Sequence, residues 1–148
     1  MHVQTTRFGV IEIDEAKVIT FIPGLLGFSS YTRYVLLQPD DDAVFFWLQS
    51  LDAPELAFVV TDPSIWSPKY QVPIKREQMK ELGIDRLEEA QVLVIVNKRN
   101  DTLTANLQGP LIVNTLEMCG HQMVIADRSW STQQEILRIE APAQAVSA

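Results

Sequence analysis

Short, closely spaced apolar segments are the feature of this sequence that most restricts its fold. Each is no longer than a strand, and Asp, Asn or Pro residues interrupt them, as at residues 40–42 and 52–54. Val, Ile, Phe and Trp are frequent in them, which suits the pleated surface of a sheet. Ten strands are predicted in this way, at residues 9–13, 18–22, 34–38, 44–51, 56–61, 70–74, 91–97, 103–107, 111–114 and 122–126.

Ten short strands joined mostly by short loops favour a closed or sandwiched antiparallel sheet over alternating strands and helices. We therefore predict a mainly β, single-domain antiparallel β-barrel or sandwich-like sheet with one or two short helices. A helix is expected at residues 75–82, where Gly83 ends it, and a short capped turn at 85–88. The segment 131–139 fits either a helix with a capping box or a final strand. The domain is expected to span residues 1–140, with small residues forming a frayed tail at 141–148.

The apolar pattern within the strands predicts how they are buried. Residues 44–48 and 92–96 are continuously apolar, so both faces of these strands are expected to be covered, with Trp47 in the core. Residues 103–107 alternate, which predicts one polar or wet face. Asn106 and Asn114 lie in strand-like segments, where their amides are expected to tie loop backbone to the sheet.

The charge balance restricts the kind of partner. Twelve Lys and Arg against 19 Asp and Glu leave a net charge of −7. Binding to nucleic acid or an anionic membrane depends on clustered basic residues, so neither is expected here. The N-terminal residues lack the apolar stretch of a signal peptide, and a single cysteine, Cys119, cannot form an internal disulfide. These features predict a cytoplasmic protein.

A search for catalytic and metal-binding motifs finds none, so no catalytic residue, metal or cofactor is predicted. No nucleophile elbow, Walker loop or dinucleotide fingerprint occurs. Gly24 and Gly27 are interpreted as turn residues because a phosphate site would need a following helix and a nearby Lys. Cys119 and His121, separated by a glycine that indicates a turn, lack the further ligands of a metal site.

Exposed acidic and aromatic residues are the candidates for contact with a partner. Trp66 lies in a loop between Pro63 and Pro68, where it forms either a lid over the core or a contact surface. The candidates for partner binding are Asp40, Asp41, Asp42, Glu55, Trp66 and Tyr70.

Three motifs, taken in order, resemble the FliW family of flagellar assembly factors. The first has the pattern F-x-x-G-L-x-G-F, the second is F-W-L-Q-S, and the third has the pattern N-L-x-x-P-x-x-x-N, followed by a late glutamine. The residues that carry them are Phe21, Gly24, Leu25, Gly27, Phe28, Phe46, Trp47, Leu48, Gln49, Asn106, Pro110, Asn114 and Gln122. The resemblance covers residues 4–139, and these motif residues are expected mainly to hold the fold.

The resemblance implies a cytoplasmic protein that is not an enzyme and binds two partners. One is flagellin before its export, and the other is CsrA, an RNA-binding repressor of flagellin mRNA translation. Capture of CsrA when flagellin leaves would relieve that repression. The chain itself is expected to be a monomer when unbound and to touch neither nucleic acid nor membrane. A small-ligand-binding β-barrel, a flagellin-only chaperone and a component of a larger assembly are the alternatives.

Overall fold

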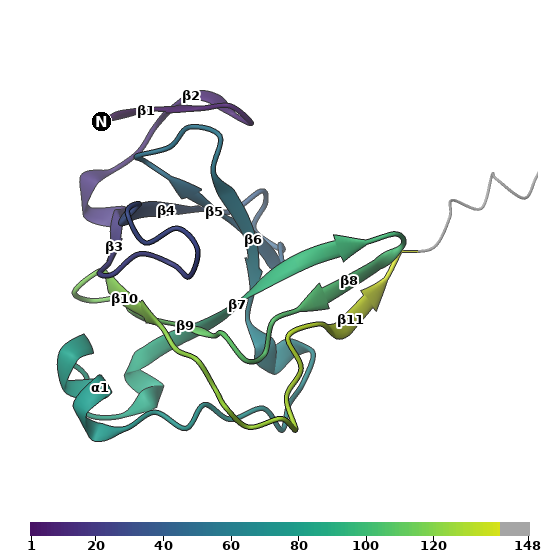
Figure 1. Ribbon diagram of the computed structural model, residues 1–148. Coiled ribbons are helices and arrows are strands. Elements are labelled where there is room, and N and C mark those ends of the chain that lie inside the picture. Colours follow the sequence, from purple (N-terminus) through teal and green to yellow (C-terminus); the bar gives the residue numbers. More distant parts are fainter. Residues whose placement is uncertain (140–148) are drawn as a thin grey trace, which may run out of the picture.

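The computed structural model describes residues 1–139, so the expected tail at 141–148 lies outside the described residues. The strands and the helix appear in Figure 1, and short 3₁₀ turns lie at Glu15–Lys17, Pro63–Ile65 and Leu87–Glu89. The strands are β1 (His2–Thr5), β2 (Gly9–Glu12), β3 (Ile19–Phe21), β4 (Arg33–Leu37), β5 (Phe45–Ser50), β6 (Ala57–Thr61), β7 (Ala90–Arg99), β8 (Thr102–Ala105), β9 (Leu111–Asn114), β10 (Cys119–Gln122) and β11 (Gln134–Arg138), and the helix is α1 (Arg76–Leu82).

The main sheet closes into a barrel. Strands β3 to β7 pair in sequence, β9 pairs with both β7 and β10, and β10 returns to β3 as the parallel pair. Closure in this way leaves no free edge around the ring. The expectation of a mainly β barrel is therefore confirmed, with one parallel pairing in an otherwise antiparallel ring.

Strand β7 has ten residues and borders two structures in turn. Its first half pairs with β9 and completes the barrel, whereas its second half pairs with β8. Strand β11 adds to the far side of β8. The second half of β7, β8 and β11 form a three-stranded projection (Figure 1), which we call the finger.

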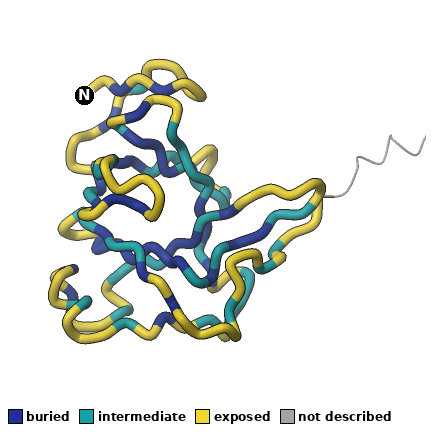
Figure 2. Tube along the Cα trace, viewed as in Figure 1, coloured by how far each residue is buried: buried dark blue, intermediate teal, exposed yellow. Residues whose placement is uncertain are grey.

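Alternate residues of the strands fill the barrel. The inward side chains form one buried cluster, coloured dark blue along the central strands in Figure 2. Its members are Ile19, Phe21, Leu25, Tyr34, Leu48, Val60, Leu93, Leu111 and Val113. The β1–β2 hairpin packs on the outer side of β4 through Val3 and Val35, and α1 packs outside β9 through Leu82 and Ile112.

Several local expectations are wrong. Residues 70–74 form no strand: Val72 packs against the α1 cluster, and Pro73 has no N–H for a ladder. The strand expected at 122–126 lies at Cys119–Gln122, so Gly120 is a strand residue and not a turn. Strand β1 was not expected. The open segment 131–139 contains β11, and Ser131 Oγ accepts from the Gln133 N–H in a turn before it.

The turn near residue 85 and the covering of β5 also differ from expectation. The Asp85 N–H donates to the Glu89 carboxylate, so Asp85 is not the cap and Glu88 not its partner. The outer residues Phe45 and Trp47 of β5 are only half-buried, so the run 44–48 is not covered on both faces.

Candidate partner-binding surface

The shifted pKa values of the ionisable groups are explained by burial, hydrogen bonds and neighbouring charges. Burial raises the pKa of the Cys119 thiol, and the charge of Glu117 adds to this, which is opposite to what a reactive cysteine needs. Burial, with smaller contributions from Asp52 and Tyr31, raises the pKa of Tyr34 to about 12. Residues 1–139 contain no group of three His, Cys, Asp or Glu side chains placed to hold a metal ion.

The glycines of the first motif lie where a side chain does not fit or where the backbone turns to positive φ. A Cβ on Gly24 would lie 2.3 Å from the Tyr31 carbonyl oxygen and 2.6 Å from that of Phe28. Gly27 has φ of +84°, in the left-handed region that favours glycine. Phe21 and Leu25 reach into the barrel core, while Phe28 stays partly exposed and packs edge-on against Phe58 at 5.2 Å.

The polar motif residues tie distant segments together. Gln122 accepts from the Leu26 N–H at 2.7 Å and donates to the Gly109 carbonyl at 3.0 Å, which links the motif loop to the turn before β9. Asn114 donates to the Leu82 carbonyl at the end of α1, at 2.6 Å. Asn106 accepts from the Gln108 N–H at 3.1 Å. The Gln49 amide donates to three carbonyls, those of Ser50, Pro54 and Leu56.

The other residues of the second and third motifs lie on either the inner or the outer side of the barrel wall, or in the turn before β9. Phe46 and Leu48 point inward, where Leu48 is fully buried, and Trp47 points outward. Pro110 is buried in the turn just before β9, where its lack of an N–H leaves the ladder intact.

Two predicted contact segments meet at one end of the barrel. Thr61 Oγ1 donates to the Val44 carbonyl at 2.6 Å, which holds the β4–β5 loop against the loop after β6. The same hydroxyl accepts from the Trp66 indole N–H at 3.1 Å. The Trp66 ring also stacks on Phe45, with 5.5 Å between ring centroids. These contacts bring residues 40–44 and Trp66 to the same end of the barrel.

A hollow of about 390 Å³ opens between these loops, and we call it the mouth groove. Val44 is 38% exposed and Ile65 is 50% exposed, so both present apolar surface at its edge. The groove is lined by Leu36, Ala43, Val44, Phe46, Asp62, Ile65, Gln91, Leu93 and Thr115. An apolar hollow with a few polar groups is the usual form of a recognition site.

A second hollow, of about 610 Å³, adjoins the mouth groove. The two share Asp62 and Gln91, whose side chains are joined by a hydrogen bond of 3.2 Å. Tyr70 and Glu88 line the second hollow. The Tyr70 hydroxyl donates to the Leu107 carbonyl at 2.6 Å, and burial raises its pKa, so this side chain is held in place.

The charged side chains that line the two hollows are acidic. Asp62 lies in the shared wall and Glu88 in the second hollow, while neither hollow is lined by Lys or Arg. Asp40, Asp41 and Asp42 are exposed in the loop that leads to Ala43 and Val44. This combination suits a partner segment that carries apolar side chains beside cationic groups.

The predicted contact residues therefore separate into two places. Residues 40–42 and Trp66 lie in the two loops that border the mouth groove, next to its lining residues Ala43 and Ile65, and Tyr70 lines the hollow beside it. Glu55 lies apart, in the β5–β6 loop at the opposite end of β5. Of the exposed apolar edge, Ile65 lies with Trp66 in the loop that the sequence predicts as a lid or a contact surface, whereas Val44 was not identified as a contact residue from sequence.

Comparisons with known proteins agree over nearly the whole chain. The family model described as FliW protein matches residues 2–136. A flagellar assembly factor FliW of Geobacter sulfurreducens is 41% identical over 135 residues, covering 90% of this chain and 84% of the relative. One from Leptospira interrogans is 34% identical over 144 residues, covering 95% and 96%. The chain belongs to the FliW family of flagellar assembly factors.

A solved FliW structure supports the same family assignment at the level of the fold. A crystal structure of the flagellar assembly factor FliW superposes with a TM-score of 0.83 at 30% identity, and covers 93% of this chain and 97% of that one. The resemblance inferred from the three motifs is thereby confirmed. The FliW relatives are described as assembly factors, and within residues 1–139 no helix is long and apolar enough to cross a membrane.

Proposed function

We propose that this FliW-family chain binds flagellin and CsrA by turns in the cytoplasm. Capture of CsrA would relieve its repression of flagellin mRNA translation when flagellin has been exported. The chain is a monomer when free and contacts neither nucleic acid nor membrane itself. The observation that carries the proposal is the largely apolar mouth groove on a FliW fold, whose lining has one carboxylate, Asp62, and no Lys or Arg, because an RNA-binding protein presents basic surface to its ligand.

The charge of the groove supports CsrA as the occupant. Asp62 and Glu88 line the two hollows, and basic residues are absent from both linings. The three aspartates of residues 40–42 line neither hollow and lie in the loop just before the lining residues Ala43 and Val44. Opposite charge across an interface steers association and excludes wrong partners. The apolar floor made by Leu36, Phe46 and Leu93 would receive side chains from the same segment.

Calorimetric titration tests the proposal. The purified chain is titrated with CsrA of the same bacterium, and the titration is repeated after saturation with flagellin. We expect binding to CsrA that flagellin abolishes. Binding to flagellin alone would favour a flagellin-only chaperone, and binding to neither would contradict the proposed function.

Neutralising the acidic loop tests where CsrA docks. The variant D40N/D41N/D42N is expected to slow association by roughly 3- to 10-fold at low salt, with less effect as screening increases. Its control is E15Q/E77Q/E81Q, which removes the same charge from exposed positions that are not adjacent in sequence to any lining residue of the mouth groove. Equal association rates for the two variants would remove the loop from the interface.

A small-ligand site is the second candidate function. The mouth groove volume of about 390 Å³ falls within the range of small-molecule pockets, roughly 300–1,000 Å³. Its polar groups Asp62 and Gln91 bond to each other, which leaves few of them directed at a ligand. A thermal-shift screen of small metabolites, with flagellin as a positive control, separates this candidate from the first.

A further inference from the structure

The outer face of the barrel wall carries an apolar row where polar residues are usual. Trp47 of β5 pairs across the ladder with Val59 of β6, and Val59 pairs with Val96 of β7. One face of an antiparallel sheet normally packs on the core while the other is solvated and polar. These three residues form an apolar stripe from β5 to the root of the finger, in which Trp47 and Val59 are half-buried and Val96 is buried. Phe8 of the β1–β2 turn covers one edge of the stripe, with its ring edge-on to Trp47 at 5.8 Å.

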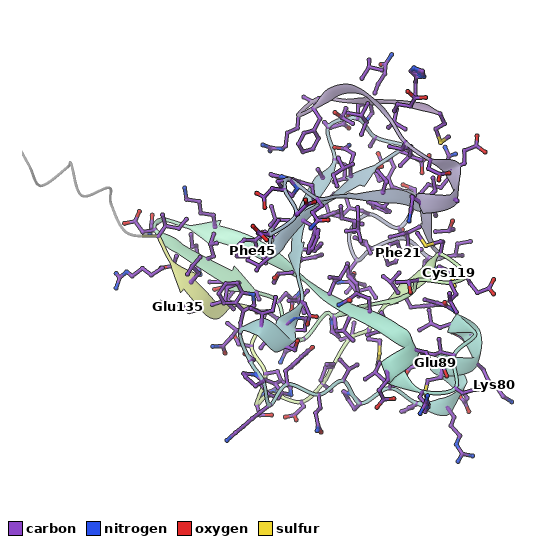
Figure 3. All side chains as sticks on the ribbon, turned by 180° about the vertical axis from the view of Figure 1, so that it is seen from behind. Phe21, Phe45, Lys80, Glu89, Cys119 and Glu135 are labelled. Carbon is purple, nitrogen blue, oxygen red and sulfur yellow. The ribbon has the colours of Figure 1, made fainter. Side chains whose placement is uncertain are left out.

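Neighbouring elements cover the wall on both sides of this stripe. The β1–β2 hairpin covers the outer side of β4, and Trp130 with Tyr70 covers Val94 of β7. Trp47 and Val59 belong to none of the buried clusters of residues 1–139. A hollow of about 490 Å³ lies over them, and we call it the outer groove. Figure 3 labels Phe45, which borders it, beside the junction of barrel and finger.

Two cations border the outer groove. The Arg7 guanidinium carbon lies 4.2 Å from the centre of the Trp47 ring, and Lys98 pairs across the ladder with Leu103. Neither cation forms an ion pair within residues 1–139, where the pairs are Arg33–Asp52 and Arg86–Glu89. The groove lining contains no Asp or Glu. On a chain of net charge −7, this is an apolar surface with a basic border.

We propose that the outer groove docks a segment of a partner protein in which apolar side chains are flanked by Asp or Glu. The apolar row would exclude water from the contact, and a carboxylate would reach Arg7 or Lys98. Of the two proposed partners, flagellin is assigned to this groove, because a basic RNA-binding partner would be repelled by Arg7 and Lys98 and matches the mouth groove, which has Asp62 and no cation in its lining. The assignment to flagellin rests on the proposed function. The expected chemistry of the occupant, apolar side chains flanked by carboxylates, rests on the groove alone.

The two grooves lie on opposite faces of β5. Phe46 faces the barrel and Trp47 faces outward, and Phe46 is the one lining residue that the grooves share. Segments of opposite charge can therefore be recognised at separate places on the same wall. Mutual exclusion of the two partners would then act through β5 and its loop, and not through a common set of contacts.

The groove is tested first with anilinonaphthalene sulfonate, a fluorescent probe that joins apolar rings to an anionic group. We expect saturable binding to the full chain that R7E/K98E weakens at least tenfold. The control K69E/K80E makes the same charge change at exposed positions away from the groove, and Lys80 lies on α1, across the barrel from the finger (Figure 3). Circular dichroism confirms that both variants fold. Equal loss of dye binding in the two variants would overturn the proposal.

The occupant is tested second, by displacement. Flagellin is expected to displace the dye from the parent chain and to bind R7E/K98E at least tenfold more weakly than K69E/K80E. Flagellin that binds the parent without displacing the dye would overturn its assignment to this groove. Flagellin that does not bind the parent would contradict the proposed function. The dye experiment would still show whether the outer groove binds an apolar, anionic molecule. Tighter dye binding after deletion of residues 140–148 would identify that segment, and not a partner, as the occupant.

Discussion

Replacing Leu48 with alanine tests the assignment of inward and outward residues along β5. Leu48 is fully buried in the barrel cluster, and its cross-strand neighbours are Leu36 on β4 and Phe58 on β6. Because β5 is held by ladders on both sides, the wall cannot collapse into the space that the side chain leaves. Leu→Ala changes in such cores cost about 2–5 kcal/mol, and the cost rises with the cavity that remains. We expect about 3–5 kcal/mol here for that reason.

The expected loss of stability is large enough to measure by two methods. At about 2–4 °C per kcal/mol for a chain of this size, the melting temperature falls by roughly 6–20 °C. Urea unfolding followed by tryptophan fluorescence, with calorimetry as a second probe, gives the free energy of unfolding. The control is Leu116→Ala, the same chemical change at a side chain that is 90% exposed. It is expected to stay within about 0.5 kcal/mol of the parent.

Equal stability of the two variants would refute the assignment. A strand has a side-chain period of two, so a slip of one residue moves every side chain to the other face. Leu48 would then point outward and Trp47 inward, and both grooves described above would lose their linings. The comparison therefore tests the barrel interior and the basis of the binding surfaces together.

Three further substitutions test contacts that link distant parts of the chain. Gly120→Ala places a Cβ 2.5 Å from Cε1 of the fully buried Phe21. We expect this overpacking to lower the free energy of unfolding by about 1–3 kcal/mol, as measured by thermal melting. The second change Phe21→Leu is expected to restore part of that stability. Asn114→Ala leaves the Leu82 carbonyl and the N–H groups of Leu116 and Glu117 without their side-chain partner, and is expected to cost about 1–3 kcal/mol in urea unfolding. Burial alone would raise the pKa of Asp52, but hydrogen bonds from Arg33, 2.7 Å away, outweigh it and lower the pKa. Because the folded pKa is below the unfolded one, this stabilisation is present above the unfolded value of about 3.9 and disappears as the pH falls through the folded pKa. Arg33→Met should therefore flatten the decrease of stability below about pH 4, and an unchanged urea midpoint profile from pH 6 to 2.5 would contradict the pair's role.

Strand content and the barrel class could be predicted from sequence because they depend on local pattern. Short β-branched and aromatic runs bounded by turn residues identify most of the strands. Gly120 was misread because glycine usually marks a turn, whereas here it is required by a phenylalanine about a hundred positions earlier in the chain. The sequence of β11 is compatible with both a helix and a strand. It forms a strand because it pairs with β8, a contact that the local sequence does not show. Contacts of this kind are absent from any local window.

The candidate site was only partly predictable for the same reason. Acidic loops and a loop tryptophan are visible in the sequence, but only closure of the barrel brings residues 40–42 and Trp66 to one end. Trp47 was expected in the core because a continuous apolar run has no period that tells which face is covered. The structure places Trp47 outside, under the Arg7 guanidinium.

The continuous apolar run in β5 is itself informative once both faces are known. Phe46 and Leu48 are explained by the barrel interior, so the core alone accounts for every second residue. The outward residues Phe45 and Trp47 gain nothing from that core, and a polar residue at either place would keep the strand soluble and paired. A row of partly exposed apolar side chains also carries a risk of non-specific association. The outward apolar residues of β5 are therefore the part of this strand that the barrel interior does not explain, and they are the observation from which the outer groove is argued.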